Sequence, residues 1–553
     1  MTTSSKNKAE VPAGSGGNDT GKVASVGKGR WFIYIVIFLA AMMQLVRIYQ
    51  VRSKNGDVPF HSANDRSRWC TIESLATTGG YEIDHLLFTD ETQGKRTPWA
   101  SIDMVRHRGR DGMLHYYSSK PPLLPTLYAG VYWCLKKVTG MDLIRDTFDV
   151  ARIMLVLVNW IPLLIFWIFW LRSFAGDGQS SWSALVLSIL LGFGTFLSTF
   201  ASTLNNHLPA AIAVGISVWC LNKILVTGDA RLRWFALAGL CTSFGAANEL
   251  PALSWVAAAG AMLLIVAPLK FVLGYLPALL PVLISFFGFN YLAHDELSPA
   301  YAHRDVGKEL FSVDIQAGTN HLSTGSLIGM MRANGIECSA NCSVREARRP
   351  RTYELLDNEN QRQFALRLSA DETKLTAYEW GDWYDYPKSY WLPGKKQGVD
   401  KGEPDRGTYI FHCLIGHHGI FSLTPFWLIS LFGLAYVFHE RSSINFFRDH
   451  RWMLCLAIFV TSVVVIGFYL SRSLEDRNYG GVTSGFRWTF WMIPLWLWLA
   501  RAALANIESA FWRRFTELLV LLSIFSASYP WANPWTTPWP MQLAEHWGWI
   551  RPS

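Results

Sequence analysis

Charged residues are scarce in this chain, and long stretches of it contain almost none. Asp, Glu, Lys and Arg make up 17% of the 553 residues, whereas 50% of the residues are apolar. The stretches WFIYIVIFLAAMMQLV, IMLVLVNWIPLLIFWIFWL and ALVLSILLGFGTFLSTFA are each long enough to cross the hydrocarbon core of a bilayer. Length alone would have allowed several soluble domains, but this pattern excludes them. It predicts an all-α polytopic membrane protein.

The chain also lacks a dominant basic cluster, although its formal net charge is +8. We therefore attribute the excess of Lys and Arg to loops on the inner side of the membrane and expect no nucleic-acid partner. The 26 tryptophans fit aromatic belts at the two membrane interfaces.

Cysteine is rare in the polar parts of the chain. Four of the eight cysteines lie in or beside apolar segments: Cys134, Cys220, Cys241 and Cys455. A free cysteine in such a place behaves as a small apolar side chain. Only Cys338 and Cys342, in CSANC, lie close together in a polar stretch. A bridge between them would require an oxidising compartment, and the sequence leaves both the bridge and the free thiols open.

The apolar pattern divides the chain into five regions. We expect a disordered cytoplasmic tail at 1–30, a transmembrane core at 31–292 with a first outer loop at 49–150, an extracytoplasmic insert at 293–417, further transmembrane helices at 418–530 and an extracytoplasmic tail at 531–553. About eleven spans are expected, near 31–48, 152–171, 183–203, 208–226, 234–250, 252–268, 271–291, 419–438, 452–470, 487–501 and 515–529. The first thirty residues are too long and polar for the start of a signal peptide, which favours an uncleaved anchor.

Lys and Arg in three short loops set the expected orientation. These loops contain Lys223, Arg231 and Arg233; Arg441, Arg448 and Arg451; and Arg513 and Arg514. All three lie inside if the amino terminus is cytoplasmic and if KPPLLPTLYAGVYWCLKK lies along the outer interface without crossing. Lys136, Lys137 and Arg145 are then outside, against the usual trend.

Under this topology, six polar patches next to spans face outward. They are Asp65, Arg66 and Arg68 in NDRSR; Lys120 in SSKPPLLP; Asn205, Asn206 and His207 in LNNHLPA; Glu249 in ANELPAL; His417 and His418 in GHHGIFSLTP; and Glu475, Asp476, Arg477 and Arg487 in SLEDRNYGGVTSGFRW. Charged groups near bilayer depth are costly and mark functional cavities. The gathering of six patches on one face predicts an active site there.

Asp65 has two interpretations. NDRSRWCTIESL reads as a helix capped by Ser62 or Asn64, in which Asp65 favours the helix dipole. Alternatively, Asp65 is a general base towards an acceptor hydroxyl, or a metal ligand, at the membrane surface.

The motifs of the first outer loop resemble those of the GT-C glycosyltransferases. An acidic residue followed by Arg and an aromatic residue, as in NDRSRW, precedes KPPL here. The branch that contains protein O-mannosyltransferases and lipid A aminoarabinose transferases carries an acidic-x-x-Arg-aromatic motif and a Lys-Pro-Pro-Leu motif in this order. The resemblance covers the first third of the chain best. Beyond it, only the span count, the outer-loop spacing and GFRW before a late span are similar. The whole chain also resembles planctomycete-type membrane proteins that carry SANDRSRW, SSKPPLLPT and NYGG.

By this match, Asp65 takes the place of the catalytic acidic residue, Arg68 that of the motif arginine and Lys120 that of the motif lysine. The resemblance implies a sugar donor linked to polyprenyl phosphate, with its phosphate near Lys120 and Arg487 and its lipid among the spans. It also implies location in the bacterial inner (cytoplasmic) membrane. A leaving phosphate needs cationic donors, and the fork of an arginine suits it. The alternatives are a Pro-Pro helix start at Lys120 and a snorkelling arginine at 487.

The second outer loop departs from the family. Related enzymes commonly carry an aspartate where this chain has Asn206 and His207. The loss of that negative charge weighs against a divalent-metal site, but a histidine with carboxylates can hold a transition metal, so a divalent metal stays possible and no cofactor is certain. A polar turn that caps a helix before Pro209 is the alternative. Glu249 is a lone carboxylate in apolar sequence and is either a second acid/base group or the partner of a nearby cation.

His417 and His418 lie near His412 and suggest a metal cluster. Adjacent histidines point apart, and the spacing is not that of a helical HExxH site, so we expect these side chains to line the mouth of the cavity.

The resemblance therefore implies an integral-membrane glycosyltransferase (hexosyl or pentosyl transfer), and the expected topology puts its site on the extracytoplasmic face. Its partners would be a lipid-linked sugar donor, membrane lipid and an acceptor that the sequence does not identify. Two other classes stay open: a transporter or lipid-translocating protein, and an inactive GT-C-like scaffold that binds a lipid-linked glycan. A transporter should show internal repeats and midplane charges, whereas here no repeat is evident and the charges lie at span ends.

Overall fold

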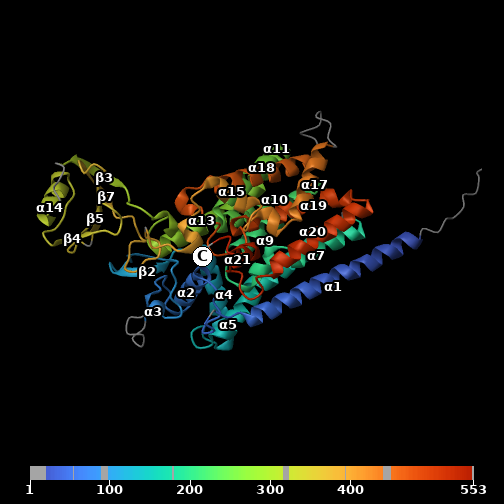
Figure 1. The fold of residues 1–553 in the computed structure, drawn as a ribbon, viewed down its shortest axis with the longest axis horizontal. Helices are drawn as coiled ribbons and strands as arrows, with labels where there is room; N and C mark the ends of the chain where they lie inside the picture. Colours follow the sequence, from blue (N-terminus) through green and yellow to red (C-terminus); the bar gives the residue numbers. More distant parts are fainter. Residues whose placement is uncertain are drawn as a thin grey trace, which may run out of the picture.

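The computed structural model describes residues 20–53, 55–88, 97–176, 180–315, 323–360, 362–392, 394–439 and 450–550. The molecule is elongated: a bundle of helices forms one part, a small layer of helices and a β-hairpin covers one end of the bundle, and a separate sheet lies beyond that layer (Figure 1).

Six helices among the described residues are long and apolar enough to cross a membrane, at 31–50, 147–172, 181–202, 207–225, 268–294 and 450–470. They are α1 (Thr20–Gln50), α5–η2–α6 (Thr147–Leu155, Val156–Trp160 and Ile161–Gly176), α7–α8–η3 (Ser181–Phe193, Phe196–Thr199 and Phe200–Ser202), α9 (His207–Leu225), α12–η5–α13 (Pro268–Lys270, Phe271–Tyr275 and Leu276–His294) and α18 (His450–Leu470).

The expected number of eleven spans is not confirmed. The other five expected spans correspond to α10 (Leu232–Asn248), η4–α11 (Leu250–Ala252 and Leu253–Val266), α17 (Trp427–His439), α19 (Ile493–Ala505) and α20 (Ala510–Ser528). Four of these are shorter than the roughly 20 residues that a helix needs to span a bilayer. The fifth, α20, carries Arg513, Arg514 and Glu517 in its first half.

The amino-terminal helix begins earlier than we expected. α1 starts at Thr20, inside the segment that we expected to be a disordered tail, while residues 1–19 lie outside the described residues. Arg441 and Arg448 of the expected inner loop also lie outside them. The cytoplasmic orientation of the amino terminus stays a prediction.

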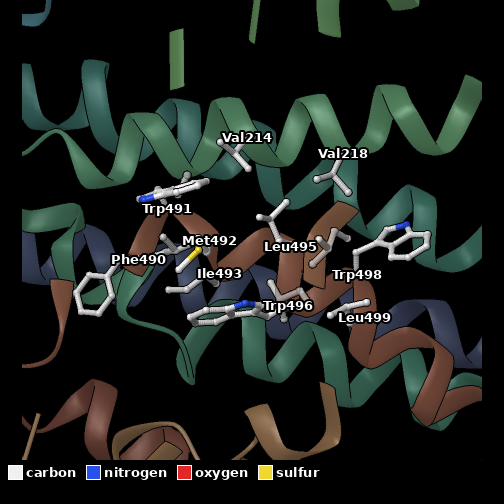
Figure 2. Close-up of a cluster of buried hydrophobic side chains, with 14 of the residues drawn as sticks. Val214, Val218, Phe490, Trp491, Met492, Ile493, Leu495, Trp496, Trp498 and Leu499 are labelled. Carbon is white, nitrogen blue, oxygen red and sulfur yellow. The ribbon is translucent and has the colours of Figure 1, made fainter. Parts of the chain in front are cut away.

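The centre of the bundle is built around α9 and α19. Figure 2 shows Trp491 and Leu495 facing Val214 and Val218 of α9 across the helix interface. All four side chains are fully buried. On the opposite side, α17 approaches closely because Gly433 has no side chain: a Cβ there would lie 2.2 Å from the carbonyl oxygen of Leu499. This packing fixes the segment that leads into α19, and that segment begins with Arg487, one of the expected site residues.

The layer at the end of the bundle comes from the first outer loop. It contains α2 (Ala63–Thr77), α3 (Asp84–Leu87), the antiparallel strands β1 (Met104–Arg108) and β2 (Leu114–Ser118), and α4 (Leu123–Thr139). α4 comes from the KPPL segment; it packs on α2 and is not among the six long apolar helices. The buried side of this layer includes Trp69 and Tyr132.

The expectation of an all-α protein was wrong for the insert. There, one antiparallel sheet has the strand order β3-β7-β6-β5-β4. Its elements are β3 (Glu309–Asp314), α14 (Thr324–Ala333), β4 (Cys342–Glu346), β5 (Thr352–Asp357), β6 (Arg362–Leu368) and β7 (Lys374–Glu379). The physical reason is that apolar residues recur at every second position in these segments, and this period favours strands. In KLTAYE, Leu375 and Ala377 are fully buried, whereas their neighbours are not.

The insert is joined to the first outer loop by aromatic side chains. Trp383 and Tyr384, which follow β7, pack with Val105 and Tyr117 of the hairpin. The Trp391 indole donates a hydrogen bond to the carbonyl of Ile102 (2.7 Å). These contacts hold the insert against the end of the bundle where the expected site residues lie.

Candidate active site

Arg68 is a buried residue in the first half of α2. Ser62 caps this helix by accepting a hydrogen bond from the backbone N–H of Asp65 (3.1 Å). One turn further, the Arg68 guanidinium bonds the carbonyl and side-chain oxygens of Asn64. Its other terminal nitrogen donates to the side chain of Asn206 at 2.7 Å. This bond links the first outer loop to the turn before α9.

Two breaks in the bundle place Asn206, His207 and Glu249 together. Asn205 holds the turn before α9, because its side chain donates to the carbonyls of Phe200 and Thr203 and accepts from the N–H of Leu208. Glu249 lies in extended backbone (φ −133°, ψ 97°) between α10 and η4. It therefore leaves the helix surface and faces the turn.

Glu249 is the centre of a continuous hydrogen-bonded chain. Its Oε1 accepts a bond from the Asn206 amide (2.7 Å) and contacts Nδ1 of His207. The other ring nitrogen of His207, Nε2, lies 3.1 Å from Nη1 of Arg487. The polar groups thus run from Arg68 through Asn206, Glu249 and His207 to Arg487.

The chain fixes the tautomer of His207. An arginine guanidinium only donates, so Nε2 of His207 must accept from Arg487. Nδ1 then carries the hydrogen and donates it to Glu249. His207 and Glu249 are 2% and 5% exposed, so this pair lies out of bulk water. A carboxylate that orients a neutral imidazole is the arrangement of an acid/base pair.

Arg487 is held by an unusual loop. Tyr479, Gly480 and Gly481 are three successive residues with positive φ (58°, 95° and 80°). The carbonyl of Gly480 accepts a bond from Nε of Arg487 (2.6 Å), and a Cβ on Gly480 would lie 3.1 Å from Cγ of Arg487. The guanidinium lies over the ring of Trp535, 4.9 Å from its centroid. Loop and ring together hold the guanidinium beside His207.

Lys120 provides a third cation at the same end of the bundle. Its ammonium pairs with Asp103 at 3.0 Å. Burial lowers the pKa of Lys120 to about 8, and the nearby charges of Arg68 and Arg487 act in the same direction, whereas Asp103 raises it. Lys120 therefore lies within electrostatic reach of both arginines of the chain, although it donates to a different carboxylate.

Asp65 adjoins the other expected residues, but it bonds the backbone on both sides of them. It is 1% exposed, and its oxygens accept bonds from the backbone N–H groups of His61 and Leu204, both at 3.1 Å. Burial raises the pKa of Asp65 to about 6, against the opposing effect of these bonds. Among the described residues, the hydrogen-bonded chain does not include Asp65, which instead ties the start of α2 to the turn before α9.

Two further carboxylates lie near the site, and sequence reasoning did not single them out. Asp103 pairs with Lys120, and Asp400 of η7 (Gly398–Lys401) accepts from the Tyr390 hydroxyl at 2.9 Å. Both interact electrostatically with Arg487. Asp103 precedes a strand and Asp400 lies in the insert, so neither adjoins an apolar span, which was the signal that we used.

The histidines before α16 (Ile420–Leu423) support the loop of Arg487. The ring of His418 stacks on Tyr479, with centroids 4.7 Å apart, and the Tyr479 hydroxyl donates to Glu403 at 3.2 Å. The ring of His412 stacks on that of His417 at 3.7 Å, so their lone pairs do not converge on one point. We expected His417 and His418 to line the mouth of the cavity; His418 is fully buried beneath Tyr479.

One group of three possible metal ligands lies close together among the described residues, and it is in the insert. The sulfur atoms of Cys338 and Cys342 and a carboxylate oxygen of Asp357 lie within 4.8 Å of one another. Both cysteines are free thiols. Asp357 already accepts bonds from Ser339 and Asn360, so it fits a turn-forming carboxylate better than a ligand. A divalent metal at the bundle site stays a prediction.

No protein-family model matches the chain, and no curated protein matches its sequence. Seven chains in solved structures are similar to it, among them three structures of Archaeoglobus fulgidus oligosaccharyltransferases. The Archaeoglobus fulgidus oligosaccharyltransferase in its apo form is 9% identical, with a TM-score of 0.40 over 94% of this chain and 58% of that one. The same enzyme tethered to an acceptor peptide is 11% identical (TM-score 0.37, 92% and 56%).

The third structure is the A. fulgidus enzyme AglB in complex with an inhibitory peptide and a dolichol-phosphate (11% identity, TM-score 0.38, 92% and 56%). The chain spans a little more than half the length of these proteins. Identities and TM-scores this low do not show a shared activity. The function therefore has to be argued from the residues of the site.

Proposed function

We propose that the chain is a membrane-embedded glycosyltransferase that transfers a sugar from a lipid-phosphate-linked donor to an acceptor at the outer face. The observation that supports this most is the hydrogen-bonded chain from Arg68 to Arg487. Its members come from the first outer loop and from breaks next to α9, η4 and η10 (Arg487–Met492), yet they meet in one buried place.

Three cations suit a phosphate leaving group. Arg68, Lys120 and Arg487 interact with one another electrostatically. When the bond between the sugar and the phosphate breaks, its electron pair and a negative charge pass to the phosphate oxygen. Preformed cationic donors in a site with little water stabilise that charge most. Arg487 suits this role because Nε of its guanidinium is anchored on Gly480, while Nη1 donates to a neutral imidazole.

Glu249 and His207 suit the proton transfer. When a donor phosphate draws Nη1 of Arg487 away, Nε2 of His207 becomes free to accept the proton of an acceptor hydroxyl. The acceptor oxygen then attacks the anomeric carbon as the lipid phosphate leaves, with inversion. Glu249 stabilises the imidazolium that forms, as an acidic partner does in a catalytic triad.

The assignment of Asp65 as the general base stays a prediction. Its two bonds from backbone N–H groups favour a different role, in which it holds the turn that carries Asn206 and His207. We therefore place the base at His207 and give Asp65 a positioning role. Substitution of each residue separates the two assignments.

The test is donor turnover by the purified protein in nanodiscs. Polyprenyl-monophosphate sugars with hexosyl and pentosyl groups are supplied with envelope-extract acceptors, with and without EDTA, and released lipid phosphate is measured. Release that Arg487→Gln abolishes and Arg472→Gln preserves would support the proposal. Arg472 is a matched control because it pairs with Asp476 in the same loop. Binding of every donor without release would favour the inactive scaffold, and failure to bind any of them would refute the proposal.

A further inference from the structure

A groove separates the outer end of α1 from α5 and η2. It has a volume of about 500 Å³, and eight of its nine lining positions are uncharged, including Val46, Tyr49, Val156 and Leu157. This volume is in the range of sites that hold a ligand. Figure 1 shows α1 ending beside α5, at the end of the bundle that carries the candidate active site.

The charged position in the groove is Arg152. Its guanidinium lies over the rings of Tyr49 (4.4 Å) and Phe148 (5.5 Å). Its one ion-pair contact among the described residues is with Asp149 at 3.7 Å, and that carboxylate is 68% exposed. The side chain of Arg152 is 18% exposed, and its Nε is buried without a hydrogen-bond partner in the described part of the chain. A weakly compensated cation thus sits at the mouth of an apolar groove.

The position of Arg152 along its helix corresponds to the membrane depth of a lipid headgroup. Arg152 lies in the second turn of the span at 147–172, and Tyr49 lies one residue before the end of α1. Val46, Val156 and Leu157 lie about one turn deeper, towards the middle of the two helices. The groove is therefore cationic and aromatic at the interface and apolar below it. Long basic side chains and aromatic rings prefer this depth.

A second cation strengthens the positive potential at this end of α1. Arg47 is 3% exposed, and it donates to the carbonyl of Pro530 (3.3 Å) and lies over the ring of Trp531 (4.9 Å). Within the described residues, no carboxylate forms an ion pair with it. Arg47 does not line the groove, but its charge adds to that of Arg152 at the same membrane depth.

We propose that this groove binds one anionic glycerophospholipid, with an acyl chain against Val46, Val156 and Leu157 and its phosphate at Arg152. Charge complementarity selects the headgroup, because the groove offers a cation and no buried acid among its lining residues. The bound lipid fills the space between α1 and α5. This site is independent of the proposed transfer reaction, because none of its lining residues takes part in the hydrogen bonds that connect the side chains of Arg68 and Arg487.

Native mass spectrometry of the full-length protein in mild detergent tests this assignment. Phosphatidylglycerol and phosphatidylcholine with identical acyl chains are titrated in turn, and the occupancy of the first bound lipid is compared. We expect a preference for phosphatidylglycerol that Arg152→Gln reduces about fivefold, the effect of one basic residue near an anionic surface.

Two further variants make the outcome specific. Arg145→Gln is the matched control. Arg145 also pairs with a neighbouring aspartate and lies just before the start of α5, but it does not line the groove. It should leave the preference unchanged. Val46→Trp fills the groove from a position that is 46% exposed, so it should lower the occupancy of both lipids without disturbing the core.

Equal affinity for the two phospholipids, or an unchanged preference in Arg152→Gln, would overturn the proposal. The proposal would also be overturned if a polyprenyl monophosphate displaced phosphatidylglycerol and if the binding of that polyprenyl monophosphate depended on Arg152. In that case the groove would hold the lipid of the sugar donor, not a resident phospholipid.

Discussion

Replacement of Glu249 by glutamine should reduce sugar transfer far more than it reduces stability. The change keeps the shape of the side chain and removes its charge. Oε1 of Glu249 receives both the Asn206 amide and Nδ1 of His207. A glutamine oxygen can still accept these bonds, but only as a neutral group.

The size of the effect follows from the two bonds. A hydrogen bond to a charged group contributes about 1.5–3 kcal/mol and one between neutral groups about 0.5–1.5 kcal/mol, so two bonds lose about 2–3 kcal/mol together. Most of this loss falls on the transition state, where His207 becomes a cation beside Glu249. We therefore expect the rate to fall by about 30- to 150-fold.

The measurement is single-turnover release of lipid phosphate at saturating donor, with thermal unfolding of the same preparation. Glu296→Gln is a matched control, because Glu296 pairs with His303 at 3.2 Å but is 49% exposed and lies outside the site. This control should retain its rate. If Glu249→Gln transferred sugar as fast as the unmodified protein, His207 and Glu249 could not be the acid/base pair.

Three further predictions concern neighbouring residues. Lys120, with its pKa lowered to about 8, loses its charge as the pH rises through 8, so the KM for donor should rise there, whereas Lys120→Arg should keep a flat profile between pH 7 and 9. The raised pKa of Asp65 means that its folded state holds a proton up to about pH 6. Its contribution to stability, about 3 kcal/mol, is therefore complete below pH 4 and lost by about pH 6.5. The difference in melting temperature between the unmodified protein and Asp65→Asn should change in this window. The transfer rate per folded molecule of Asp65→Asn should stay within a few-fold of that of the unmodified protein. Gly480→Ala should cost about 1–2 kcal/mol because φ is 95°, and it should raise the KM for donor by displacing Arg487; an unchanged melting temperature and KM would contradict this.

Local sequence was enough to select most of the polar residues that meet at the bundle end. Asn206, His207, Glu249 and Arg487 each interrupt apolar sequence beside a helix end, and the cost of a polar group at that depth marked them. Their order in the chain of hydrogen bonds could not be predicted, because it depends on how α9, α10 and α19 pack. Asp65 shows the limit most clearly, since a motif placed it in the site whereas its hydrogen bonds turn it towards the backbone of Leu204.

The insert and the shorter helices were harder to predict for a different reason. A period of two in KLTAYE covers only six residues, which is too short to outweigh a predominantly helical chain. In the bundle, α17 and α19 have 13 residues each, and hydropathy alone did not distinguish them from full spans. Packing such as that of Gly433 on Leu499 stabilises these helices, and it is not visible in composition.

The contact of Trp535 with Arg487 has a consequence for biosynthesis. Trp535 also donates a hydrogen bond to the hydroxyl of Thr203 (3.0 Å), so a residue close to the end of the chain braces two segments made much earlier. In a chain synthesised only as far as Arg487, the guanidinium has no aromatic surface to rest on, because Trp535 follows it by almost fifty residues. The arrangement around Arg487 is therefore complete only when the segment that contains Trp535 folds back onto the turn before α9.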